Sequence, residues 1–259
     1  LESIYYLSIL LGLKTMKNNS SNRIRTFLFL FTLLLLSVGL GILVRALDFS
    51  VGISVGVSVL TFFLMFVLFG RWGSSQVQHQ MGGRVATQEE FPRLHNAIDG
   101  LCLSHGVEAP VLRVLDAPSV NIAALSTKKE NTLVVTSGTF LSLGVVELEG
   151  LLALALVRMQ EPMLAKEIQK SFWMTIPFAR YFIRNAVKTD DILLLDQKSV
   201  ALTRFPPGLI GALEIADQVG TFVEGSSSTS QLWVLDPTAQ LATSGHPSAS
   251  LRCAALSEI

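Results

Sequence analysis

The chain has 259 residues, of which 50% are hydrophobic and only 15% are charged, and its formal net charge at pH 7 is zero. This composition is too apolar for an ordinary soluble domain and predicts a membrane protein. Because no excess of positive charge is present, nucleic acid is not expected as a partner. Cys102 and Cys253 are too few for a disulfide framework and favour a reducing compartment.

The first 25 residues form a segment of their own. An apolar run lies within residues 1–15, but it is shorter than the roughly 20 residues that a bilayer-crossing helix needs. Residue Met16 begins a second, more conventional start. We interpret residues 1–25 as an N-terminal segment that is either an upstream extension or a helix at the membrane interface.

Two long apolar runs follow, at residues 26–47 and 51–70, joined by three residues. Each is long enough to cross a bilayer, so residues 26–70 are predicted to form a transmembrane helical hairpin. Basic residues flank it on both sides: Lys14, Lys17, Arg23 and Arg25 before it, and Arg71, Arg84 and Arg93 after it. The positive-inside rule therefore predicts an integral membrane protein with both termini and the main domain cytoplasmic.

The rest of the chain is predicted to form an α+β domain. Residues 71–90 are polar and contain glycine, so we expect a linker there. A helix is expected over residues 91–105, and β-rich runs follow at residues 111–116 and 131–138. The apolar spacing in residues 145–160 predicts a buried helix that Pro162 ends. Helical patterns resume after Asp190, so one central helix should lie between a small sheet and a second helix.

The segment from Asp116 to Met159 resembles the HtpX-type membrane zinc metallopeptidases. In that family a D-x-P-x-x-N-A strand, a T-x-G-L-L turn and an E-L-E-x-V-L-A-H-E-x-x-H helix follow one another in this order. Further blocks at residues 191–203, 231–237 and 245–259 keep the family order. The resemblance implies a zincin-like (gluzincin) metallopeptidase domain over residues 91–259 and a place in a bacterial inner membrane.

The resemblance also implies where a zinc site would lie. The HExxH motif corresponds here to Leu154, Ala155, Leu156, Val157 and Arg158. Leu154 and Arg158 stand at the two histidine positions, Ala155 at the catalytic glutamate, and Ile192 at the third ligand. A gluzincin site needs two imidazoles, a carboxylate ligand and a glutamate base. We therefore predict no catalytic residue, no metal and no cofactor.

Asp196 and His246 match family positions beside the metal site. An arginine introduced among apolar residues is costly unless it is paired. We therefore expect Arg158 to pair with Asp196, and Leu154 to pack against Ile192. The alternative is that Arg158 reaches solvent past the end of its helix.

Two further surfaces are expected to bind partners. One is an exposed edge strand, which could accept a partner strand; its residues are Ser119, Val120, Asn121, Ile122, Ala123 and Ala124. The other is an aromatic and basic segment that faces the membrane or a partner, unless its rings pack on this protein's own core. Its aromatic residues are Phe172, Trp173, Phe178, Tyr181 and Phe182.

These observations lead to two functional interpretations. The first is a catalytically inactive, membrane-anchored HtpX-like pseudopeptidase that acts as a structural or regulatory subunit of a membrane protein complex. Its partners would be membrane lipid and other membrane-protein subunits. The alternative is a membrane-bound zinc metallopeptidase of protein quality control that uses non-standard ligands.

Overall fold

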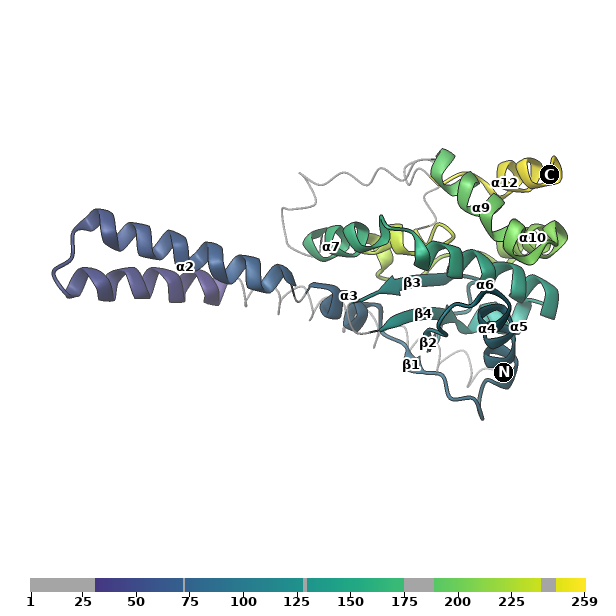
Figure 1. Ribbon diagram of the computed structural model, residues 1–259, viewed down its shortest axis with the longest axis horizontal. Helices are drawn as coiled ribbons and strands as arrows, with labels where there is room; N and C mark the ends of the chain where they lie inside the picture. Colours follow the sequence, from purple (N-terminus) through teal and green to yellow (C-terminus); the bar gives the residue numbers. More distant parts are fainter. Residues whose placement is uncertain (1–30, 72, 128–129, 175–188, 239–245) are drawn as a thin grey trace, which may run out of the picture.

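The computed structural model describes residues 31–71, 73–127, 130–174, 189–238 and 246–259. Two apolar helices project from an α+β body, as Figure 1 shows. The predicted α+β class is confirmed. The expectation for residues 1–25 lies outside the described residues.

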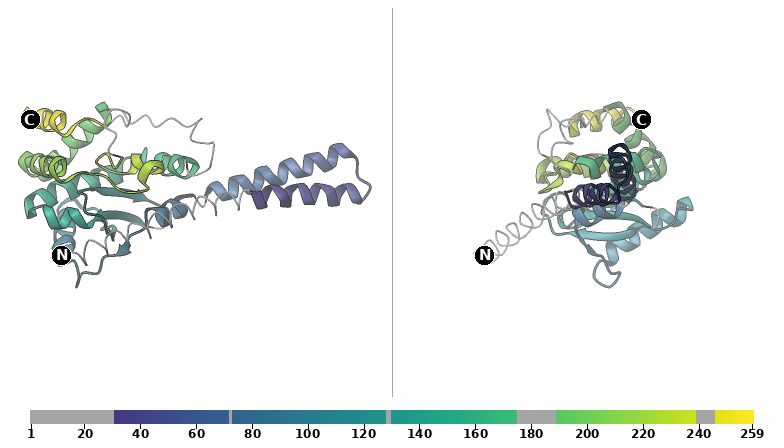
Figure 2. Two further views of the ribbon diagram at one scale, coloured as in Figure 1. Left: turned by 180° about the vertical axis from the view of Figure 1, so that it is seen from behind. Right: turned by 90° about the vertical axis from the view of Figure 1, so that its left-hand side faces the viewer.

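The projecting part is a pair of antiparallel helices, Phe31–Ala46 and α2 (Val51–Arg71), which run side by side in both views of Figure 2. They approach closely at Gly41, where an added Cβ would lie 1.8 Å from the Ser58 hydroxyl oxygen and 3.0 Å from the Ser54 carbonyl oxygen. Small residues of this kind let apolar helices pack backbone against backbone. Within the described residues, α2 is the one helix that is long and apolar enough to cross a membrane.

The body contains a four-stranded sheet in the order β1-β2-β4-β3. The strands are β1 (Arg84–Val85), β2 (Val111–Leu115), β3 (Ile122–Ser126) and β4 (Asn131–Thr136). The central pair, β2 and β4, is parallel, whereas β1 and β3 pair with their neighbours in the antiparallel direction. Strands β3 and β4 are buried almost throughout, which explains their continuous apolar sequences.

Helices cover this sheet and extend the body away from it. They are α3 (Gly73–Met81), α4 (Pro92–His105), α5 (Ser137–Ser142), α6 (Val145–Gln160), α7 (Leu164–Met174), α9 (Thr189–Thr203), α10 (Pro206–Val219) and α12 (Ala249–Ser257), with 3-10 turns η1 (Ser226–Ser228) and η2 (Ser230–Leu232). In Figure 1, α6 lies between the sheet and the group formed by α9, α10 and α12.

Helix α6 is enclosed on nearly every side. Its bounds and its central position agree with those predicted from the sequence. Every side chain from Leu151 to Val157 is buried, so the helix is apolar all round rather than along one stripe. It crosses α10 at very short range, because an added Cβ on Gly150 would lie 2.6 Å from the carbonyl carbon of Gly208. This close crossing fixes the position of the second half of α6.

The prediction of a linker at residues 71–90 is wrong for most of that range. Residues 73–81 form α3, which packs on α7 and places Val77 and Met81 in the core. Residues 84–85 form the edge strand β1. The polar residues of α3 suggested a linker because only one side of this short helix is apolar.

Candidate functional site

The central helix borders a small cavity of about 20 Å³ in the interior of the body. This is space for roughly one water molecule. The cavity is lined by Leu154, Arg158, Ile192, Leu195, Gln231, Trp233, Val234, His246 and Arg252. The structure thus brings together four residues that the sequence singled out, from α6, α9 and the stretch before α12.

Leu154 and Ile192 both line this cavity and are buried, in agreement with their predicted proximity. Ala155 is fully buried in the core of α6. The apolar side chains give this end of the cavity no group that could ligate a metal or transfer a proton.

The predicted pair between Arg158 and Asp196 is wrong. One guanidinium nitrogen of Arg158, Nη2, donates to Glu167 Oε2 at 2.5 Å and to the carbonyl oxygen of Gln231 at 2.8 Å. The side chain is only 12% exposed, so the alternative of an arginine that reaches solvent is also wrong. Helix α7 brings Glu167 over the end of α6, and this acid meets the need of Arg158 for a charged partner.

Glu167 and Gln231 belong to a network that joins α6, α7 and η2. Burial raises the pKa of Glu167, and the nearby Arg158 opposes that rise. The Gln231 side chain donates to the Glu167 carbonyl oxygen and to the Ser171 hydroxyl, both at 2.8 Å. Arg158 therefore serves as a cross-link between three elements.

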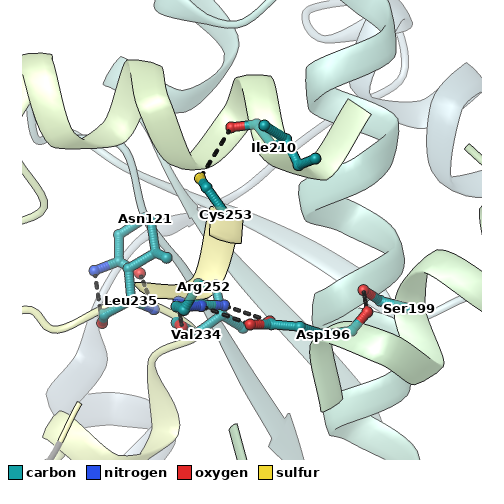
Figure 3. A network of polar contacts seen from close by, with 8 residues as sticks. All are labelled: Asn121, Asp196, Ser199, Ile210, Val234, Leu235, Arg252 and Cys253. Carbon is teal, nitrogen blue, oxygen red and sulfur yellow. Dashed lines mark hydrogen bonds and ion pairs between the residues drawn. The ribbon is translucent and has the colours of Figure 1, made fainter. Parts of the chain in front are cut away.

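Asp196 pairs instead with Arg252 of α12. The guanidinium donates through Nε to Oδ2 at 2.8 Å and through Nη2 to Oδ1 at 2.6 Å, and through Nη1 to the Val234 carbonyl oxygen at 3.2 Å. Figure 3 shows this arrangement. The sequence contained a sign of this pair that our prediction did not use. Arg252 stands among small and apolar residues in the last helix, and a buried arginine requires an acidic partner.

His246 also lines the cavity and is buried. Burial lowers the pKa of His246 to about 4; the cations Arg252 and Arg158 also lower it, whereas Asp236 acts in the opposite direction. The imidazole is therefore neutral at pH 7.

The residues of this cavity do not fit a zinc ion. A zinc site needs at least three nitrogen, sulfur or oxygen ligands that converge on one point. Nowhere in the described ranges do three His, Cys, Asp or Glu residues form such a group. The cavity offers one imidazole, His246, beside the guanidinium groups of Arg158 and Arg252, which would repel a cation.

An edge strand was predicted at this place and is present, but the prediction that it is exposed is wrong. Strand β3 does lie last in the sheet, but its residues and those just before it are buried, and this holds for Ser119, Val120, Asn121, Ile122, Ala123 and Ala124. Residues 233–235 cover its outer edge. The amide of Val234 donates to the Ile122 carbonyl oxygen at 2.9 Å, and Ala123 pairs with Trp233 in an antiparallel bridge.

The side chain of Asn121 completes this cover. Its amide nitrogen Nδ2 donates to the Leu235 carbonyl oxygen at 3.1 Å, and its Oδ1 accepts from the Leu235 amide at 3.2 Å (Figure 3). A partner strand therefore finds no free hydrogen-bonding edge at this place. Sequence reasoning missed the cover because it is supplied from more than 100 positions away.

The aromatic segment is divided between the core and other surroundings. Phe172 is buried, so packing on this protein's own core is correct for that ring. Trp173 is partly buried and stacks on Phe66 of α2, with ring centroids 4.6 Å apart. The expected membrane-facing residues Phe178, Tyr181 and Phe182 lie outside the described residues.

Comparison with known proteins finds curated relatives that share most of the length of this chain. The chain is 26% identical over 224 residues to a protease HtpX homolog of Dictyoglomus turgidum, which covers 70% of this chain and 74% of the relative. A protease HtpX homolog of Tropheryma whipplei is 25% identical over 264 residues, covering 83% of this chain and 87% of the relative. Both relatives carry the name protease.

These similarities support an HtpX-type family for this chain. A third relative, the protease HtpX homolog of Dictyoglomus thermophilum, is 27% identical over 195 residues, covering 60% of this chain and 64% of the relative. No family model matches the chain, and no solved structure matches it. The resemblance to an HtpX-type family is therefore confirmed by curated relatives.

The prediction that the chain is not an enzyme is contradicted by the same comparisons. The relatives carry the name protease, and proteases are enzymes. That prediction depended on the residues at the HExxH position and on Ile192 at the position of the third ligand. The relatives do not support a catalytically inactive regulatory subunit, and we withdraw that interpretation.

Proposed function

We propose that this chain is a membrane-anchored protein of the HtpX-type peptidase family that acts on polypeptides at the membrane surface. The proposal depends chiefly on one observation, the apolar exterior of α2. Only 6% of its apolar window, residues 51–68, is buried by the rest of the protein. The peptidase names of the relatives supply the expected class of substrate.

The side chains of α2 are far more exposed than a water-soluble protein tolerates in one place. Val59, Leu60 and Phe63 are each more than 60% exposed, and they lie on one continuous apolar helix. Burying each in lipid is worth about 1.5–3 kcal/mol. The polar hydroxyls are already satisfied, because Ser54 and Ser58 donate to carbonyl oxygens one turn earlier. The paired helices are therefore suited to span a bilayer as a hairpin.

The charge distribution favours one orientation of this hairpin. Arg84 and Arg93 follow α2 in the body, whereas residues 47–50, which connect the two helices, contain no basic residue. The nearest cation is Arg45 in the last turn of the helix Phe31–Ala46, whose guanidinium donates to the Phe49 carbonyl oxygen at 3.0 Å. We propose that the body is cytoplasmic and that the connection faces the other side. Alkaline phosphatase fused to the C-terminus should be inactive in bacteria, and an active fusion would contradict this orientation.

Membrane attachment can be tested with charged substitutions. Leu60→Arg combined with Leu64→Arg places two cations in the middle of the exposed face of α2, which is strongly unfavourable in lipid. We expect carbonate-washed membranes to retain the unmodified chain and to lose the double variant. Leu103→Arg is the matched control, because Leu103 is an exposed apolar residue on α4 of the body. Release of the unmodified chain by carbonate would contradict the proposal.

Action on polypeptides can be tested directly on the purified full chain in mild detergent. Fluorescently labelled, unfolded casein is incubated with the chain, and both retention on the immobilised protein and new peptide ends by mass spectrometry are measured. We expect retention or cleavage of unfolded casein and neither for a folded control protein. The absence of both effects with unfolded casein would contradict this part of the proposal.

A further inference from the structure

Helix α2 has two different faces in its last apolar turns. Phe63, Leu64, Val67 and Leu68 point outward and are exposed. Over the same turns, Met65 is half-buried against the buried apolar cluster, which includes Leu33 of the other projecting helix, and Phe66 contacts Trp173 of the body. The apolar surface that requires lipid and the surface that contacts the body are therefore at the same level of the helix.

Trp173, near the end of α7, makes the most defined contact at this level. Its indole stacks on the ring of Phe66, with centroids 4.6 Å apart and planes 26° apart. The neighbouring ring of Phe172 meets Trp173 edge to face at 5.1 Å. Phe172 itself is held beneath α3, because an added Cβ on Gly73 would lie 2.7 Å from its ring. The indole thus has a fixed position relative to α2, α3 and α7.

The length of α2 places this contact near one boundary of a bilayer. The apolar window spans 18 residues, from Val51 to Leu68. At 1.5 Å per residue this is about 27 Å, close to the roughly 30 Å of a hydrocarbon core. If the connection before Val51 lies at the far boundary, Phe66 lies about 22 Å along the helix and so within about two helical turns of the near boundary.

We propose that Trp173, stacked on Phe66, is an interfacial anchor that seats the body on the lipid headgroup region and fixes the depth of α2. This inference rests on the proposed membrane attachment. An indole suits this position because its apolar rings favour the acyl boundary and its N–H favours the hydrated headgroups. The partner is the bilayer surface itself, and the body sits on it without an intervening flexible linker.

Fluorescence quenching by brominated lipids tests the depth of the indole. The full chain is reconstituted into phosphatidylcholine vesicles brominated either near the headgroup or deep in the acyl chain. A variant that keeps only Trp173, made by Trp72→Phe and Trp233→Phe, should be quenched more strongly by the shallow bromines. The matched variant that keeps only Trp233, a core residue that is 2% exposed, should not be quenched. Equal quenching of the two variants would overturn the anchor.

A second comparison does not require a change in the core. In a chain that already carries Trp72→Phe, the further change Trp173→Phe leaves Trp233 as the remaining indole and should remove the shallow quenching that the Trp72→Phe chain shows. Phe66→Ala removes the stacking partner and should reduce the quenching of Trp173, whereas Phe63→Ala, on the exposed face of the same turns, should leave it unchanged. Unchanged shallow quenching in the Trp173→Phe variant would overturn the inference.

Flotation of the same vesicles separates the two proposals. A chain that floats with the vesicles but whose Trp173 is not quenched contradicts the anchor alone. A chain that does not float contradicts membrane attachment and the anchor with it.

Discussion

Arg252 and Asp196 form a bidentate ion pair that joins α12 to α9, although 56 positions separate them in the chain. The side chains are 3% and 1% exposed, so the pair is removed from water. The third donor of the arginine holds the Val234 carbonyl oxygen, so one guanidinium positions two helices and the segment that covers β3.

Loss of one partner of this pair should be severe. Asp196→Ala leaves the Arg252 guanidinium buried without its acid, and we expect a loss of about 3–5 kcal/mol in the free energy of unfolding. Urea unfolding in detergent, followed by circular dichroism, measures this loss. Arg84→Ala is the control, because the pair of Arg84 with Glu90 is largely exposed, and no measurable loss is expected. Equal effects of both substitutions would contradict the structural role of Asp196.

The crossing of α6 and α10 should not tolerate a methyl group. In Gly150→Ala the added Cβ would meet backbone atoms of Gly208 and Leu209 at 2.6 Å, and backbone cannot move aside as a flexible side chain can. We expect a loss of about 1–3 kcal/mol in the free energy of unfolding. Gly100→Ala in α4 meets no atom within 4 Å and should stabilise by about 0.5–1 kcal/mol. A harmless Gly150→Ala would contradict the close crossing.

His246 should make the fold sensitive to acid. Its pKa is about 4 in the folded protein and about 6.5 when unfolded. Because folding lowers this pKa, the contribution of His246 to stability is complete above about pH 6.5 and is lost as the pH falls toward 4. The full loss is about 3 kcal/mol. Urea unfolding over this pH range should therefore show a weaker pH dependence for His246→Gln than for the unmodified chain, whereas His105→Gln on the exposed end of α4 should change nothing.

Arg158 and Glu167 should show a measurable coupling in a double-mutant cycle. Their side chains are 12% and 23% exposed, and Arg158→Met and Glu167→Gln keep most of the packing. We expect a coupling of about 1–3 kcal/mol. The pair of Lys198 and Glu161 is more exposed and should give about 0.2–1 kcal/mol in the same cycle. A coupling near zero for Arg158 and Glu167 would show that α7 does not depend on this contact.

Local sequence signals predicted the central elements well. The bounds of α6 followed from its apolar spacing and from the stops at each end, and the β-rich runs became β2 and β4. The resemblance also assigned Leu154, Arg158, Ile192 and His246 to one site, and in the structure all four line one cavity. Each of these features depends on neighbours in sequence or on the order of whole blocks.

The errors concern partners chosen among distant groups. Both Glu167 and Asp196 were available to Arg158, and the choice depends on how α7 crosses α6, which periodicity does not specify. The polar stretch at residues 73–81 likewise became a helix because Phe172, far along the chain, packs on Gly73. Burial by a remote segment leaves no trace in the local pattern.

The cover on β3 has a consequence for the folding of the chain during its synthesis. Strand β3 is five apolar or small residues long and pairs early with the adjacent β4, but its outer edge closes only when Leu235 arrives, 114 positions after Asn121. At ribosomal rates of 5–20 residues per second this interval is roughly 6–20 s. During that time the outer edge of this uncharged strand is not yet covered, and such edges template aggregation between chains. The last quarter of the sequence therefore also protects the nascent protein from association with its own copies.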